Sequence, residues 1–313
     1  MGIIHVVEES YNNYELSFYK LFQALLEQYM RKSRIKLEFL KKTAMYIFLI
    51  IALVYTVYPI SCMFLSSVVP DAVLLKGFLI PFSTEIILSH YNVVLSKTLF
   101  TQWYLNSLTV ATLCILINIP VSVMIAYVAT RFSRKYMFLR IFGPFSLFLY
   151  MIPSVVLALP LALIFGYLKA FDTLIGLAIA DSTFALPLSL WLLWGYFSNI
   201  PPELEEAAFV DGASRWQVLF RIILPLSRPA VSAVAIFTFI TVWLDYMFAL
   251  TLIRSEVRYP VSIGMNWLIR EYSFTWGHLM AAATLIAIPS IILSVLAFKY
   301  LLYGFEMSLK GAK

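Results

Sequence analysis

Apolar residues dominate the chain in six long stretches that are separated by short polar segments. Crossing the roughly 30 Å hydrocarbon layer of a bilayer takes about 20 helical residues. The stretches cover residues 44–69, 103–128, 139–166, 173–197, 229–252 and 277–300. A helix satisfies its backbone hydrogen bonds internally, as a spanning segment must. The pattern predicts an all-α, polytopic membrane protein, with six transmembrane helices in one domain over residues 44–313.

Positive charge alternates in density between successive connecting segments. The 23 Lys and Arg residues divide into 17 on the side of the two termini and 6 on the other side. Cytoplasmic loops carry the excess of these residues. The prediction is a multi-pass cell-membrane protein with both termini in the cytoplasm. This asymmetry accounts for the net charge of +6, so the expected partners include membrane lipids and no nucleic acid.

Composition and motifs exclude several classes of function. Charged residues make up 13% of the 313, against about 25% in a typical soluble domain. No glycine is followed by the Lys and Ser or Thr of a phosphate-binding loop, and no hydrolase triad is apparent. The three histidines, His5, His90 and His278, are scattered without ligand spacing. We therefore expect no catalytic residue, no metal site and no cofactor bound by this chain.

The first 43 residues form a separate N-terminal segment. Its apolar positions recur at spacings of three and four, which is typical of an amphipathic helix: Leu16, Tyr19, Phe22, Leu26 and Tyr29. Residues 1–43 are interpreted as a cytoplasmic or interfacial segment. A helix on the inner membrane surface and a solvated extension that packs on a partner both fit this pattern.

The polar segment 200–228, between the fourth and fifth stretches, predicts a helix, a turn and a second helix. Pro201 or Pro202 suits a first helical turn, and the acidic residues after it complement the positive end of a helix. Gly212 can take the left-handed position that closes the first helix, and Ser214 can cap the second, which ends near Pro225. A short acidic helix on the inner surface can dock into a groove of a soluble protein.

This segment also resembles the signature of permeases from binding-protein-dependent ABC importers. That signature is Glu-Ala-Ala, three residues, Gly, nine residues and Ile-x-Leu-Pro, and it matches Glu206-Ala207-Ala208, Gly212 and Ile222-Ile223-Leu224-Pro225 in spacing. In that family the segment is the coupling helix, which seats in a cleft of an ATPase subunit. The resemblance implies that the ATPase-coupling residues are Glu205, Glu206, Ala207, Ala208, Asp211 and Gly212.

The family resemblance implies a set of partners as well. These are a second permease subunit in a heterodimer, two ATPase subunits that use ATP and Mg²⁺, and an extracytoplasmic solute-binding protein that touches the segment 253–276. The resemblance covers roughly residues 100–313. Within the family, this chain is most similar to the carbohydrate-uptake branch and to its maltose-type second permease. Asn106-Ser107, Trp243-Leu244-Asp245-Tyr246 and the tail Gly304–Ala312 carry it, with Leu244 where the family usually has Asn.

Two carboxylates lie within apolar stretches, and such residues usually face a cavity or a partner. Asp181 and Asp245 fall at about the same depth, on the order of 10 to 12 Å below the outer boundary. Thr238, Thr241 and Asp245 follow each other at i, i+3 and i+7. The substrate-pathway candidates are Asp245, Tyr246, Trp243, Thr241, Thr238, Asp181, Tyr150 and Asn106.

Several alternatives stay open at this point. Ser146, Tyr150 and Ser154 are aligned at four-residue spacing, yet hydroxyls in membrane helices also bond to their own backbone. The solute of an ABC permease could be a peptide or an oxyanion rather than a sugar. In a different class, a proton-coupled secondary transporter would relay protons through Asp181 and Asp245.

Overall fold

The computed structural model describes residues 38, 40–76, 83, 85–133, 135–271 and 275–311, with residues 271 and 297–311 described by their backbone alone. Every regular element in these ranges is helical, which confirms the all-α prediction. The amphipathic helix expected within residues 1–43 falls almost wholly outside the described part of the chain, and the side chains of the tail Gly304–Ala312 also lie outside it.

The chain divides into two compact units, Met1–Cys62 and Met63–Lys313. The described part of the first unit belongs to the helix Leu40–Val68, whose 29 residues match the first apolar stretch. None of the residues in its most apolar window is buried by the chain itself.

Three further helices of the second unit are long and apolar enough to cross a membrane: α4 (Phe100–Arg131), α7 (Leu174–Ser198) and α14 (Trp276–Gly311). They match the second, fourth and sixth predicted spans. The described residues contain four such straight helices, or up to six spans if each of two bent helix pairs crosses once.

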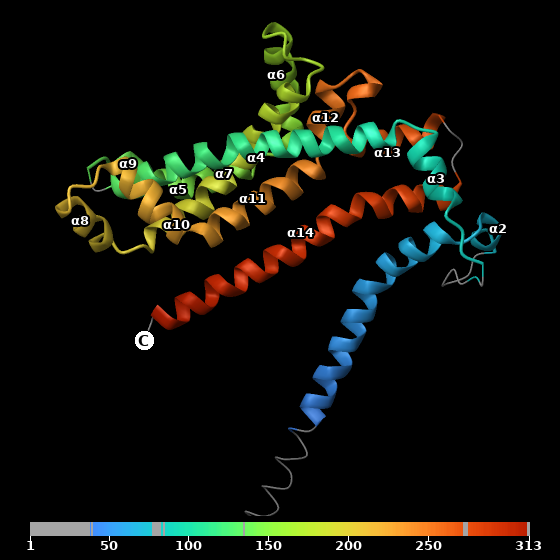
Figure 1. Ribbon diagram of the computed structural model, residues 1–313, viewed down its shortest axis with the longest axis horizontal. Coiled ribbons are helices and arrows are strands. Elements are labelled where there is room, and N and C mark those ends of the chain that lie inside the picture. Colours follow the sequence, from blue (N-terminus) through green and yellow to red (C-terminus); the bar gives the residue numbers. More distant parts are fainter. Residues whose placement is uncertain are drawn as a thin grey trace, which may run out of the picture. The chain divides into compact units, whose positions relative to one another are not determined.

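The third predicted span, 139–166, is wrong as a single helix. It consists of α5 (Met137–Tyr150) and α6 (Ser154–Tyr167), which meet at 96°. Pro153 stands before α6 in an extended conformation, and a proline disfavours helical backbone in the residue before it. In Figure 1, α6 stands away from the line of α5 and α4.

The second bent pair joins Arg215–Leu226 to Arg228–Trp243 at 77° and so lies before most of the fifth predicted span. That span, 229–252, is also interrupted within its own length. It consists of α11 (Arg228–Trp243) and α12 (Met247–Leu252), with Asp245 in the break. The carboxylate of Asp245 accepts backbone N–H groups of Phe248 and Ala249 at 3.5 and 3.1 Å. The side chain therefore caps the first turn of α12, which stabilises the break.

The second unit is organised around α4, which packs most extensively on α7 and also on α11 (Figure 1). Three clusters of buried apolar side chains follow these helices. The remaining elements are shorter: α2 (Asp71–Leu74), α3 (Ser89–Ser96), α8 (Glu203–Val210), α9 (Arg215–Val218), η1 (Leu219–Ile223), α10 (Leu224–Leu226), η2 (Glu256–Arg258) and α13 (Val261–Glu271). In Figure 1, α8 and α9 lie at one end of α4, and α3 and α13 lie at the other.

Candidate functional site

The segment with the Glu-Ala-Ala signature folds into the helix, turn and helix that its sequence predicts. Pro202 precedes α8, whose first turn is acidic. Gly212 has φ +83°, and a Cβ built there would meet nothing within 4 Å. Glycine is therefore favoured here by the left-handed backbone and not by crowding. Ser214 and Gln217 form a capping box that starts α9.

The acidic residues of α8 do not share one environment. Glu206 and Ala207 are exposed, whereas Glu205 is 4% exposed. The Glu205 carboxylate forms an ion pair with Arg131 Nε and accepts a hydrogen bond from the Tyr127 hydroxyl at 3.3 Å. Glu205 therefore does not lie on the exposed face of α8, and its role in ATPase coupling stays a prediction. Glu205 turns inward and anchors α8 to the end of α4.

Arginines hold the turn after α8 against the bundle. Arg215 lies over the ring of Phe132 at 4.8 Å and over the ring of Phe209 at 5.5 Å. Arg131 also donates from Nη2 to the Ile200 carbonyl at 3.3 Å. A buried ion pair and cation–π contacts thus hold the two ends of α8 against the bundle. Its exposed face is therefore held in a fixed position.

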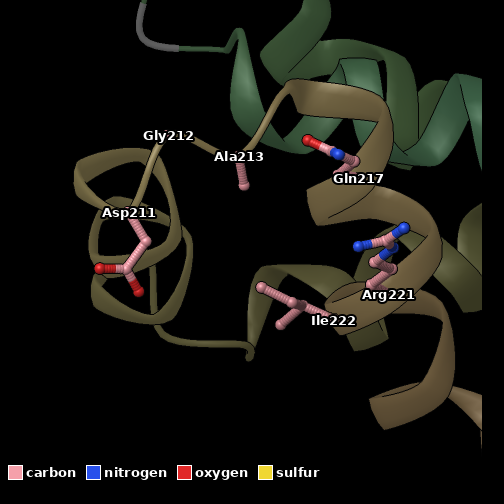
Figure 2. A pocket seen from close by; sticks show the side chains of 6 residues that line it. All are labelled: Asp211, Gly212, Ala213, Gln217, Arg221 and Ile222. Atoms are coloured by element: carbon pink, nitrogen blue, oxygen red, sulfur yellow. The ribbon is translucent and has the colours of Figure 1, made fainter.

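A shallow hollow of about 240 Å³ opens beside this turn. Figure 2 shows the turn residues Asp211, Gly212 and Ala213 on one side, and Gln217, Arg221 and Ile222 from the following helix on the other. Asp211 and Arg221 are both exposed and of opposite charge. The hollow therefore joins the glycine and the Ile-x-Leu-Pro parts of the signature, which are separate in the sequence.

The two carboxylates of the predicted pathway come together inside the bundle. Asp181 is 3% exposed on α7, and its carboxyl group lies close enough to Asp245 for the two to interact electrostatically. This agrees with the shared depth inferred from the sequence. Tyr150 packs nearby on Phe184, with ring centroids 5.1 Å apart, and Phe184 in turn contacts Phe248 of α12.

The helical alignments proposed for the pathway hold only in part. Thr238 and Thr241 lie on α11, but that helix ends at Trp243, so Asp245 does not continue their stripe. Ser146 and Tyr150 lie on α5, whereas Ser154 starts α6 beyond the bend. Thr241 is half-buried. The Ser146 hydroxyl donates to the Gly143 carbonyl at 2.6 Å, within its own helix.

Asn106 and Trp243 are engaged in packing rather than exposed to a pathway. The Asn106 amide donates to the carbonyls of Val257 and Tyr259 at 2.8 and 3.0 Å. The Trp243 indole N–H donates to the Ile286 carbonyl at 3.0 Å, and its side chain is fully buried. The polar groups of these two residues are satisfied by the protein in this structure, and their contact with a solute stays a prediction.

Thr238 and Tyr246 are likewise engaged with other side chains. The Thr238 hydroxyl accepts a hydrogen bond from Asn118 at 2.7 Å, and Asn118 also donates to Ser189 at 2.8 Å. This buried polar cluster links α4, α7 and α11. The Tyr246 hydroxyl accepts from Asn266 of α13 at 2.8 Å. Thr238 therefore contributes to helix packing in this structure, and its place in the pathway stays a prediction.

Sequence reasoning did not single out Asn118, Tyr127 or Arg131. All three lie on α4, in a stretch that reads as an ordinary membrane span. Asn118 carried one usable signal, since a polar amide within an apolar stretch is costly unless it is paired. Arg131 ends its span where a basic residue is common, so nothing in the pattern indicates a buried partner such as Glu205.

Comparison with known proteins identifies relatives of this arrangement. The sequence profile described as "Binding-protein-dependent transport system inner membrane component" matches residues 118–303. The trehalose/maltose transport system permease protein MalG of Thermococcus litoralis is 34% identical over 286 residues, covering 88% of this chain and 99% of that protein. The inner membrane ABC transporter permease protein YcjP of Escherichia coli is 30% identical over 269 residues, covering 85% and 95%.

Among solved structures, this fold is similar to a chain in the crystal structure of a bacterial ABC transporter involved in the import of the acidic polysaccharide alginate. The TM-score is 0.71 at 24% sequence identity, with 82% of this chain and 94% of that chain covered. A second structure, of the bacterial alginate ABC transporter in complex with an alginate pentasaccharide-bound periplasmic protein, gives a TM-score of 0.61 at 17% identity.

The profile match covers more than half of the chain and includes the turn, the hollow and the α11–α12 break described above. The resemblance that the signature in segment 200–228 indicated is thereby confirmed. The chain is a multi-pass membrane permease and belongs to the family of binding-protein-dependent transport system inner membrane components.

Proposed function

We propose that this chain is the permease subunit of an ATP-driven sugar importer, in which it forms half of the pathway and α8 receives the movement of an ATPase subunit. The observation that carries this proposal is the geometry of α8, which is exposed on one face and anchored on the other by Glu205. A helix held in this way can transmit a push or a pull without deforming, because its base is a buried ion pair and not a flexible loop.

The partner set proposed for this chain is a second permease subunit, two ATPase subunits and an extracytoplasmic solute-binding protein. ATP and Mg²⁺ would be bound by the ATPase subunits, and no cofactor by this chain. Both termini and α8 would face the cytoplasm, and the segment 253–276 would face the binding protein. The positive-inside distribution of Lys and Arg supports this orientation.

Charge reversal on the exposed face of α8 tests the coupling role. In Glu206→Lys, we expect loss of ATPase co-purification and of uptake, because a positive charge replaces an acidic group on the proposed docking face. Glu256→Lys is the matched control, since Glu256 is exposed on η2 at the opposite end of α4, and it should leave co-purification unchanged. Wild-type assembly and uptake in Glu206→Lys would remove α8 from the coupling role.

The sugar substrate is proposed from the relatives and from the chemistry around Asp245. Carboxylates and hydroxyls bond to the hydroxyl groups of a sugar, and aromatic rings such as Tyr150 cover its apolar faces. The proposed candidates with half-buried side chains are Asp245, Tyr246, Thr241 and Tyr150. Uptake of labelled disaccharides by the reconstituted importer, in competition with peptides and oxyanions, would identify the solute class.

The variant Asp245→Asn tests the pathway separately from assembly. Asparagine keeps an oxygen that can accept from Ala249, so the cap of α12 is largely retained while the negative charge is lost. We expect a clear fall in uptake with normal ATPase co-purification. Unchanged uptake kinetics would take Asp245 out of the pathway and leave the coupling role of α8 intact. Uptake driven by a pH gradient without ATPase subunits would instead favour the proton-coupled alternative.

A further inference from the structure

Three side chains of metal-ligand type meet at the end of the bundle opposite α8. Asp71 comes from α2, His90 from α3 and His278 from the first turns of α14, and each offers a ligand atom within 4.8 Å of the others. Both α2 and α3 pack on α14. Residues that are far apart in the sequence and lack a ligand-spacing motif are thus brought to one place by the tertiary structure.

Each histidine has an oxygen partner at one ring nitrogen. His90 Nε2 lies 3.1 Å from the Val69 carbonyl, and His278 Nδ1 lies 2.7 Å from the Thr275 hydroxyl. Such outer partners fix the tautomer and orientation of histidines that bind metals through their other nitrogen. A carbonyl can only accept, so Nε2 of His90 donates and Nδ1 is left as a lone-pair acceptor.

The ring of His90 carries an unsatisfied polar atom. The side chain is 3% exposed, and its Nδ1 has no hydrogen-bond partner among the described residues. A buried acceptor without a partner is unfavourable and is usually explained by a missing water or ion. The ring of His278 packs edge-on against that of His90, with centroids 4.9 Å apart.

Gly277 allows this close approach. A Cβ at that position would lie 2.3 Å from His90 Nε2 and 2.4 Å from its Cε1, so any larger residue would displace the ring. The backbone N–H of Gly277 also donates to Asp71 Oδ1 at 3.1 Å. Gly277 therefore contacts both His90 and Asp71 at the start of α14.

The charges and ligand types favour a particular class of ion. Two imidazoles and one carboxylate suit Zn²⁺ and related transition metals, whereas Mg²⁺ and Ca²⁺ prefer oxygen ligands alone. Lys97 is close enough to His278 to interact with it electrostatically, and its positive charge opposes a cation. The Asp71 carboxylate is the group that counters it.

We propose that Asp71, His90 and His278 form a binding site for a divalent transition-metal ion of the Zn²⁺ class. Ligand atoms around tetrahedral Zn²⁺ are about 3.4 Å apart, so small side-chain rotations bring the three groups to coordinating distance. The fourth position is left for water. A bound ion clamps α2 and α3 to the first turn of α14, a role that is independent of the proposed sugar transport.

Zinc titration of the purified full-length chain tests this site. The protein is stripped with a chelator, Zn²⁺ binding is followed by calorimetry, and Co²⁺ is added to a second sample to read tetrahedral coordination from its absorption. We expect one Zn²⁺ per chain. In Asp71→Asn the amide oxygen can still accept from Gly277, so the fold should be retained while affinity falls at least about tenfold. His278→Gln should abolish binding.

Two further variants separate the site from adventitious zinc. His5→Gln removes the remaining histidine of the chain and should leave the affinity unchanged, and Thr275→Ala should weaken binding by about tenfold or more through the orientation of His278. A wild-type chain that binds no Zn²⁺ would overturn the site. Equal Zn²⁺ affinity in the wild type and in Asp71→Asn combined with His278→Gln would do the same.

Discussion

Each end of the second unit carries a pair between a carboxylate and an arginine, and the two pairs are built differently. At the α8 end, the side chains of Arg131 and Glu205 are only 14% and 6% exposed. At the other end, Arg258 and Asp172 are 2.9 Å apart with side chains 52% and 20% exposed. The first pair fastens a short helix to the bundle, and the second fastens η2 to the segment just before α7.

The partners of the two carboxylates also differ in kind. Glu205 depends on two side chains, those of Arg131 and Tyr127. Asp172 accepts from the backbone N–H groups of Arg254 and Ser255 at 2.9 and 3.0 Å, and from the Ser255 hydroxyl. A carboxylate held mainly by backbone groups tolerates the loss of one arginine, whereas a buried carboxylate held by one charged side chain does not.

The largest expected effect is therefore at Arg131. In Arg131→Met, Glu205 stays buried without its opposite charge, and breaking a buried pair in this way costs about 3–5 kcal/mol. Unfolding in mixed micelles should show this loss, together with weaker ATPase co-purification. Arg258→Met is the matched control, for which the loss should be about 0–1 kcal/mol. Equal losses in the two variants would contradict the contrast between the two ends.

The two ends also share a feature, a residue with positive φ, and its substitution should have an intermediate effect. Gly212 has φ +83° and Asp172 has φ 56°. Gly212→Ala places a Cβ in left-handed backbone at a cost of about 1–2 kcal/mol, while Gly212→Asn should cost less because asparagine tolerates this region. The free energy of unfolding of both variants would check this order. Identical values for Ala and Asn would mean that the turn relaxes out of the left-handed conformation.

A further expected effect, similar in size to that at Gly212, is the pH dependence contributed by Asp172. Partial burial would raise its pKa, but the hydrogen bonds from Ser255 and from the backbone, together with the Arg258 charge, lower the pKa from 3.8 to about 2. Because the folded-state pKa is the lower one, its contribution to stability is present above about pH 4 and is lost as the pH falls toward 2. Melting curves of wild type and Asp172→Asn between pH 5 and 2 should converge at the acid end. A difference in melting temperature that stays the same across this pH range would mean that the substitution acts through packing rather than through the charge.

The sequence alone determined the fold class, the four straight spans and the coupling segment. Long apolar stretches have no alternative to helix in lipid, and the turn at Gly212 and the cap at Ser214 follow from local backbone chemistry. The signature in segment 200–228 could be recognised because its parts lie within one short segment. These are properties of neighbouring residues, and neighbouring residues are what a sequence displays directly.

Only the tertiary structure decided which polar groups meet. The inward turn of Glu205 toward Arg131, the use of Asn106 and Trp243 in packing, and the meeting of Asp71, His90 and His278 all join residues from different helices. Likewise, the size of the bend between α5 and α6 depends on what each helix packs against. Pairings of this kind depend on how helices cross, because the free energy of a buried polar group is set by whichever partner the fold places beside it.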